Sequence, residues 1–192
     1  MTMKLSDKVQ CLRNWEDIDN HCSLNKYSIV KYRPEFYDEH GVYMKDEWTS
    51  VSDIGNVFDG EELTKDQYLE VENAYISTVK ELVAAAGCKY LSVVGIEDYG
   101  LRRAKAFNNE NKAMYQIVSQ YTEGHRLSVN DIDYVMKLCL REQYWCILAN
   151  GRHNVQLDVG YEYYLHFYSL LPVDFVKAIV RKNNLYIARD RK

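Results

Sequence analysis

The chain has 192 residues, 47% of them hydrophobic and 27% charged, which is an ordinary globular balance and argues against disorder. Its formal net charge of −4 argues against a protein whose main task is to grip nucleic acid phosphates, so we expect no direct nucleic-acid partner. No apolar run approaches the ~20 residues that cross a bilayer, and Met1–Asn20 has no apolar stretch of signal-peptide length. We therefore expect a cytoplasmic protein without a membrane partner.

The cysteines and histidines do not form a recognisable ligand set. Five cysteines occur at irregular spacing, and no Cys-x-x-Cys pair is present for a zinc ribbon or a thioredoxin motif. The histidines are scattered, and only His21-Cys22 places two potential metal ligands together. We expect no metal site and no cofactor. Free thiols fit a reducing compartment, and three cysteines within apolar runs are predicted core residues, namely Cys88, Cys139 and Cys146.

The first predicted elements are two strands, Tyr27–Tyr32 and Gly41–Val51, which we expect to pair with each other. Pro34 lacks a backbone N–H, so it confines the first strand to an edge or an end of a sheet. Seventeen tyrosines are the one compositional outlier, and most of them are interpreted as replacing phenylalanine in half-exposed strands.

A helix is predicted to begin at Thr64, because Thr64 and Gln67 have the spacing of a capping box. Gly87 stands where a left-handed C-terminal cap is expected. The short β-branched run Lys89–Ile96 then predicts a strand covered on both faces. The buried stripe of the helix consists of residues three or four positions apart, namely Tyr68, Val71, Tyr75, Val79, Leu82, Val83 and Ala86.

The central part of the chain is predicted to be less regular. Asp98–Asn111 is polar and indicates mostly loop, and Lys112–Tyr121 indicates a short helix. Ser128 is the expected N-cap of the next helix. The inner stripe of that helix contains Ile132, Val135, Met136, Cys139 and Leu140.

The strongest β pattern lies in the C-terminal half. Tyr144–Ala149 leads into the turn dipeptide Asn150-Gly151, although four further residues make the connection longer than a tight turn. Every second residue from Val155 to Phe167 is apolar or aromatic, which predicts one long strand over 155–168. Gly160 in its middle is a candidate bulge or a place of close backbone approach.

A last helix opens at Pro172 and ends at Asn183-Asn184, and Leu185–Ala188 is predicted as a short final strand. Strands and helices are mixed without a regular βαβ period. The predicted fold class is therefore α+β, with a mainly antiparallel sheet and helices packed on it. We expect a single domain over residues 1–192, with residues 1–25 as a loosely packed N-terminal segment.

Charge is concentrated in one span. Residues Glu35 to Glu72 contain twelve acids and only two bases, a net charge of −10 that leaves +6 for the rest of the chain. Such an asymmetry suggests an acidic face that attracts a basic partner. The plainer interpretation is a solvated surface that confers solubility only.

No phosphate loop, dinucleotide fingerprint, nucleophile elbow or zinc-protease motif is present in the sequence. On the long predicted strand, Glu162, Tyr164 and His166 share one face, and such a row could serve acid–base chemistry in a small hydrolase or transferase, with His125 or His153 nearby. The same row is equally the solvent face of an amphipathic strand, or a recognition strip for a protein.

Several segments carry a family resemblance. They are Trp48 to Gly55, Leu63-Thr64 with Tyr68, Glu72 and Tyr75, then Leu140-Arg141-Glu142, Trp145-Cys146 and Val159 to Tyr164. In this order the chain resembles, over roughly Tyr27 to Tyr168, the small cytosolic immunity proteins of bacterial contact-dependent growth inhibition and related polymorphic toxin systems. The resemblance implies a non-enzymatic protein that binds and neutralises one cognate toxin domain, often a nuclease, in a complex expected to be 1:1.

The contact residues are our own inference from the acidic span, with Trp48 and nearby tyrosines as buried anchors. A generic acidic protein-interaction module is the third possibility beside the inhibitor and the small enzyme. The candidate toxin-binding residues are Asp46, Glu47, Trp48, Asp53, Asp59, Glu61, Glu62, Glu162 and Tyr164.

Overall fold

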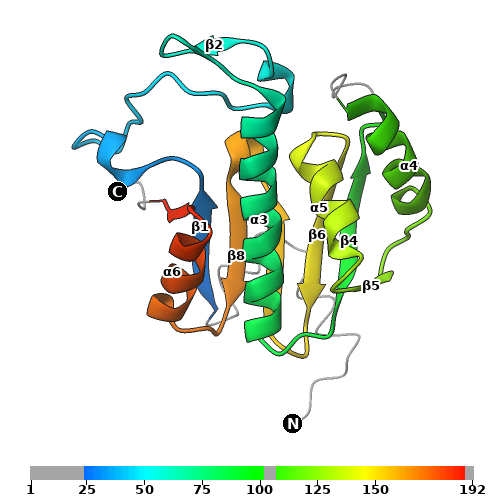
Figure 1. Ribbon diagram of the computed structural model, residues 1–192. Helices are drawn as coiled ribbons and strands as arrows, with labels where there is room; N and C mark the ends of the chain where they lie inside the picture. Colours follow the sequence, from blue (N-terminus) through cyan, green and yellow to red (C-terminus); the bar gives the residue numbers. More distant parts are fainter. Residues whose placement is uncertain (1–23, 102–106, 189–192) are drawn as a thin grey trace.

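The computed structural model describes residues 24–101 and 107–188, and Figure 1 shows a sheet with helices in front of it. Seven strands form one antiparallel sheet in the order β5-β4-β6-β7-β8-β1-β9. The expectations for His21, Cys22 and nearly all of the segment 1–25 lie outside the described residues. The strands of this sheet are β1 (Asn25–Val30), β4 (Tyr90–Asp98), β5 (Arg126–Ser128), β6 (Tyr144–Asn150), β7 (Val155–Val159), β8 (Leu165–Ser169) and β9 (Tyr186–Ile187).

The described residues include four α-helices, of which α3, α5 and α6 lie over one face of the sheet and α4 lies beside α5 (Figure 1). The predicted α+β class, with a mainly antiparallel sheet and helices packed on it, is confirmed. None of these described helices is long and apolar enough to span a bilayer. Their bounds are α3 (Lys65–Ala85), α4 (Asn108–Val118), α5 (Ile132–Leu140) and α6 (Val173–Lys182).

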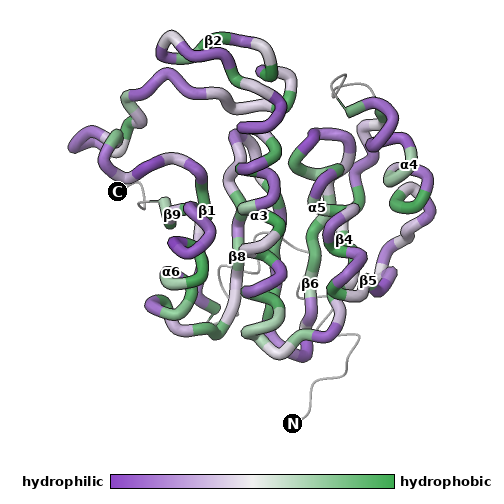
Figure 2. The backbone as a smooth tube through the Cα atoms, in the orientation of Figure 1, coloured by the Kyte–Doolittle hydropathy of each residue, from purple (hydrophilic) through white to green (hydrophobic). Residues whose placement is uncertain are grey.

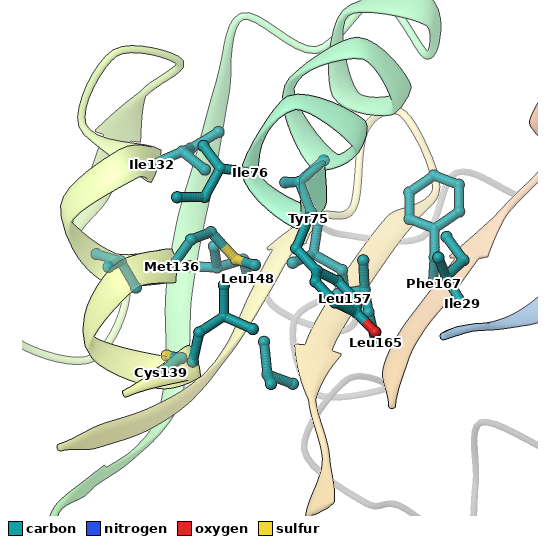
Figure 3. Packing of buried hydrophobic residues seen from close by; sticks show 14 of the residues in the cluster. Ile29, Tyr75, Ile76, Ile132, Met136, Cys139, Leu148, Leu157, Leu165 and Phe167 are labelled. Atoms are coloured by element: carbon teal, nitrogen blue, oxygen red, sulfur yellow. The ribbon is translucent and has the colours of Figure 1, made fainter. Parts of the chain in front are cut away.

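The main hydrophobic core lies between these helices and the sheet. Figure 3 shows side chains from α3 and α5 meeting side chains from β6, β7, β8 and β1. Each fully buried aliphatic side chain contributes roughly 1.5–3 kcal/mol to folding. The three cysteines predicted for the core are buried. Ile147 and Ala149 alternate with core residues along β6 and join Val94 in a second, smaller cluster on the other face of the sheet.

The best-predicted element is α3. Thr64 caps it as expected: its Oγ1 accepts from the Gln67 backbone N–H at 3.2 Å, and its own N–H donates to Gln67 Oε1 at 2.8 Å. Gly87 follows the helix with φ +74°, the left-handed conformation that favours glycine. Five residues of the predicted stripe are buried, namely Tyr68, Tyr75, Val79, Leu82 and Val83. Pro172 likewise precedes α6 as predicted.

The prediction of one long strand over 155–168 is wrong. The chain turns at Gly160, so that β7 and β8 are antiparallel neighbours, with Leu157 opposite Phe167. The turn contains the short 3₁₀ segment η4 (Tyr161–Tyr163). The period-two pattern survives because Val159 and Leu165 are separated by an even number of positions, so both point into the core.

Gly160 is confirmed as a place of close approach, since a Cβ there would lie 3.0 Å from His166 Nε2.

Three further local predictions need correction. Gly41–Val51 is not a strand paired with β1, because β1 lies between β8 and β9; Asp38 instead accepts two backbone N–H groups and folds the segment into a turn. Ser128 does not cap α5, since it belongs to β5 and its hydroxyl donates to Asp131, the residue at the N-cap. The helix expected over Lys112–Tyr121 begins earlier, at Asn108.

The chain between β1 and α3 forms a separate feature that we call the acidic lobe, residues 31–63. It arches over the end of the sheet at the top of Figure 1 and is largely hydrophilic in Figure 2. The lobe contains the 3₁₀ turns η1 (Pro34–Phe36) and η2 (Val51–Asp53) and a hairpin of β2 (Val57–Phe58) with β3 (Glu61–Glu62). It places most of the acidic span at one end of the molecule.

Candidate functional site

The acidic lobe and the first turns of α3 enclose a shallow, open hollow of about 290 Å³. Its walls combine aromatic and apolar side chains with carboxylates, a composition that suits a cationic or amphipathic group. The three acids around it are exposed. The lining residues are Trp48, Phe58, Leu63, Gln67 and Val71, with Glu61, Glu62 and Glu70 as the acids.

One wall of the hollow is the β2–β3 hairpin. Phe58 pairs with Glu61, so Asp59 and Gly60 alone make the turn. Both have positive φ, +49° and +87°, as a two-residue hairpin of type I′ requires. After the hairpin, the Leu63 backbone N–H donates to the Asn56 carbonyl and the Leu63 carbonyl accepts the Gly55 N–H, both at 2.9 Å. These two bonds join the hairpin to the start of α3. The hairpin therefore holds Glu61 and Glu62 beside the helix.

Trp48 forms the base of the hollow. The side chain is only 7% exposed, and its ring centroid lies 5.5 Å from that of Tyr68 and 4.9 Å from that of Tyr163. The Lys31 ammonium lies 4.1 Å from the Trp48 ring centroid. Trp48 is thus packed into the core and contributes only part of its surface to the hollow.

Next to Trp48, an ion pair between the buried Lys31 and the half-buried Glu47 stabilises the lobe. Lys31 Nζ donates to Glu47 Oε1 at 2.6 Å, and the Tyr43 hydroxyl donates to Glu47 Oε2 at 2.7 Å. Burial lowers the pKa of Lys31 to about 8, although its bond to Glu47 acts in the opposite direction. Glu47 therefore stabilises the lobe internally, and its charge is neutralised by Lys31.

Two other predicted acids also have internal roles. Asp53 accepts the backbone N–H groups of Thr49 and Ser50, both at 2.9 Å, and so closes the capping box of η2. Asp59 forms an ion pair with Lys45 at 3.3 Å. Asp46, by contrast, is exposed on the lobe.

The free negative charge at the hollow comes from Glu61, Glu62 and Glu70. None of the three forms a salt bridge with another residue in the described part of the chain, and all are exposed. Glu61 and Glu62 were predicted site residues, whereas Phe58 and Glu70 were not. Two signals could have found them: the Asp59-Gly60 dipeptide, which indicates a hairpin, and the position of Glu70 within two turns of the helix cap.

Glu162 and Tyr164 lie in the β7–β8 turn rather than along a strand. Glu162 is exposed, and its carbonyl accepts the Tyr32 hydroxyl at 2.8 Å, which connects the turn to the lobe. The Tyr164 ring packs on that of Tyr32, 6.0 Å away. Both residues therefore adjoin the lobe.

The predicted acid–base row does not lie along one strand, because Glu162 and Tyr164 are in the β7–β8 turn and only His166 is on β8. His166 lies on β8, and its cross-strand neighbours are Ser28, whose Oγ is 3.4 Å from His166 Nδ1, and Asp158. Burial lowers the pKa of His166 and raises that of Asp158 to about 7. His125 stacks on the Tyr121 ring at 4.1 Å.

Within residues 24–101 and 107–188, no three His, Cys, Asp or Glu side chains gather closely enough to hold a metal ion. Comparison of the chain with protein-family models, curated proteins and solved structures gives no match. Its function therefore has to be inferred from its own residues.

Proposed function

We propose that this chain is a non-enzymatic immunity protein, which binds a cognate bacterial toxin domain with nuclease activity in the cytoplasm and neutralises it in a 1:1 complex. The observation that carries the proposal is the hollow with three exposed carboxylates that form no salt bridge within the described residues, next to the packed rings of Trp48, Tyr68 and Tyr163. The proposed contact surface consists of Glu61, Glu62 and Glu70, with Asp46 as a further exposed acid of the same lobe.

The physical reason is charge complementarity. A nuclease binds the phosphates of its substrate with a positively charged groove. An acidic protein that covers this groove competes with RNA or DNA and is drawn to it quickly by long-range attraction. Acids that are already paired contribute less to such a contact, because a cation of the chain offsets their charge: the buried Lys31 for Glu47 and the exposed Lys45 for Asp59.

The small-enzyme alternative has weaker support. A general base needs a ring nitrogen beside open space where substrate can sit. His166 is half-buried, its Nδ1 lies close to Ser28 Oγ, and its Nε2 faces Gly160. The inhibitor therefore accounts better for the exposed groups that the structure places together.

The proposal is tested by co-expressing the chain with the toxin domain encoded immediately upstream of its gene, followed by pull-down. We expect growth rescue and a 1:1 complex for the wild-type chain. The variant Glu61→Gln/Glu62→Gln/Glu70→Gln removes three charges without changing side-chain size, and we expect it to lower affinity at least about tenfold and to weaken rescue.

A matched control removes three charges elsewhere, so that the net charge changes equally. It should rescue growth like the wild-type chain, because only the local contacts differ between the two triple variants. Equal behaviour of both variants would refute the hollow as the contact site, and absence of rescue and of a complex for the wild-type chain would refute the immunity role. The control substitutions are Glu97→Gln, Glu123→Gln and Asp174→Asn, all at exposed positions. Glu97 accepts a bond from the Tyr99 hydroxyl and Glu123 one from the Ile96 backbone N–H, and the amide oxygen of glutamine keeps an acceptor for each.

A further inference from the structure

The turn between β7 and β8, residues 160–164, has an unusual backbone. Glu162 has φ +54° and ψ +32°, and the next residue, Tyr163, has φ +61°. Residues with a side chain rarely adopt this left-handed conformation, and two in succession are rarer still. Because neither position is a glycine, the surrounding structure has to impose the conformation.

Two buried tyrosines impose it. The Tyr32 hydroxyl donates to the Glu162 carbonyl at 2.8 Å, and the Tyr75 hydroxyl donates to the Tyr163 carbonyl at 2.6 Å. Tyr32 belongs to the acidic lobe and Tyr75 to α3, and both rings are buried. The turn is therefore fixed from two sides by the core.

The consequence of this geometry is the placement of Tyr161. Its side chain is 95% exposed, the largest exposure of any large hydrophobic residue that the structure describes, whereas Tyr163, two positions later, is 4% exposed. A tyrosine on a rigid turn offers a large contact area and loses little conformational freedom on binding, which is typical of interface hot spots.

Tyr161 also lies at the same end of the molecule as the hollow. Tyr163 packs its ring against Trp48, the base of the hollow, at 4.9 Å, and the Glu162 carbonyl is bonded to the lobe through Tyr32. The turn that presents Tyr161 is thus joined to the base of the hollow through Tyr163 and Tyr32.

We propose that Tyr161 is the apolar anchor of the interface and inserts into an apolar pocket beside the basic groove of the toxin domain. The carboxylates around the hollow pair with basic side chains of the same partner. This inference rests on the proposed immunity function, and it assigns different kinetic roles to the two parts of the surface. Charges mainly govern the association rate, and a buried aromatic anchor mainly governs the dissociation rate.

The test measures association and dissociation rates between the chain and the upstream-encoded toxin domain. For Tyr161→Ala we expect dissociation to become at least about tenfold faster and association to stay within about twofold of wild type. The matched control is Tyr134→Ala, which removes another exposed tyrosine from α5 and should change neither rate. Thermal unfolding of Tyr161→Ala should match wild type, because the side chain is almost entirely in solvent.

A second variant tests the rigid presentation. Tyr32→Phe keeps the buried ring but removes the hydroxyl that holds the Glu162 carbonyl, so dissociation should become faster although Tyr161 is unchanged. An unchanged dissociation rate would overturn the positioning role of Tyr32.

If Tyr161→Ala dissociates from the toxin domain at the wild-type rate, the anchor role is overturned and the proposed function remains intact. A wild-type chain that does not bind the toxin domain would overturn both. Self-association of the chain that is lost in Tyr161→Ala would assign the turn to a homodimer and also overturn the inference.

Discussion

Replacing Arg141 by methionine removes the positive partner from a fully buried carboxylate. The side chains of Arg141 and Glu72 are both 0% exposed, and two bonds join them, Nε to Oε2 at 2.6 Å and Nη2 to Oε1 at 2.8 Å. Nη1 also donates to Asn111 Oδ1 at 2.7 Å, and the guanidinium lies 3.9 Å from the Phe107 ring centroid. This network connects α3, α4 and the end of α5.

The expected loss of stability follows from the charge that is left behind. Breaking a buried ion pair on one side costs about 3–5 kcal/mol, because the remaining charge is desolvated without compensation. We therefore expect Arg141→Met to lower the free energy of unfolding by about 3–5 kcal/mol. In Glu72→Met/Arg141→Met neither charge of the buried pair remains. The amide oxygen of Asn111 loses its partner, at about 1–3 kcal/mol, and the exposed Glu110 carboxylate loses its 3.3 Å contact with Arg141 Nη1, which costs at most about 1 kcal/mol.

The assay is urea unfolding of four proteins followed by circular dichroism: wild type, both single variants and the double variant. The double variant should be more stable than Arg141→Met, with a coupling energy that far exceeds the error of the measurement. A loss below about 1 kcal/mol in Arg141→Met, or a double variant as unstable as the sum of the single variants, would refute the reasoning.

Two further predictions concern the β7–β8 region. Asp158 is buried, its Oδ1 has no hydrogen-bond partner among the described residues, and its pKa is raised from 3.8 to about 7. The folded state therefore holds the proton of Asp158 more tightly than the unfolded state does, so the contribution of Asp158 to the free energy of unfolding falls by up to roughly 4 kcal/mol as pH rises from about 4 to 7. Asp158→Asn should abolish this fall. A wild-type pH profile in the variant would contradict the assignment. Burial lowers the pKa of His166, which contributes the opposite trend in both proteins. Gly160→Ala should lower the free energy of unfolding, measured by thermal unfolding, by about 1–3 kcal/mol, because its Cβ would press on His166 Nε2. Adding His166→Ala to the same chain should recover part of this loss. Additive losses in the double variant would show that the imidazole is not the obstacle.

The elements that the sequence predicts well are those whose signals are local. The start and end of α3 depend on Thr64, Gln67 and Gly87, which act within a few residues of themselves. The β6–β7 hairpin follows from an apolar run that ends in a turn dipeptide, with the longer connection that its spacing indicated. In both cases the deciding interactions lie close together in the chain.

The turn at Gly160 could not be predicted in the same way. The left-handed positions Glu162 and Tyr163 are not marked by a glycine. The groups that impose this backbone come from Tyr32 and Tyr75, which are distant in sequence. A pattern of period two continues through such a turn without interruption. Periodicity alone therefore merged two strands into one.

Only part of the candidate site could be predicted, because distant contacts also decide which of its acids are free. The excess of acids between residues 35 and 72 was visible, and Glu61 and Glu62 line the hollow. Which acids are neutralised depends on partners elsewhere, as Lys31 shows by pairing with Glu47. A sequence count of charge cannot separate a carboxylate that is buried in an ion pair from one that faces a partner.

The most direct test of the central claim is inhibition of the proposed partner, a purified toxin domain encoded upstream, measured as residual nuclease activity while the chain is titrated in at low and at high ionic strength. We predict complete inhibition at a 1:1 ratio at low ionic strength, with an apparent affinity that falls steeply as salt is added. For Glu61→Gln/Glu62→Gln/Glu70→Gln, affinity should be lower and less sensitive to salt. No inhibition by the wild-type chain, or an identical salt dependence for the two proteins, would contradict the account.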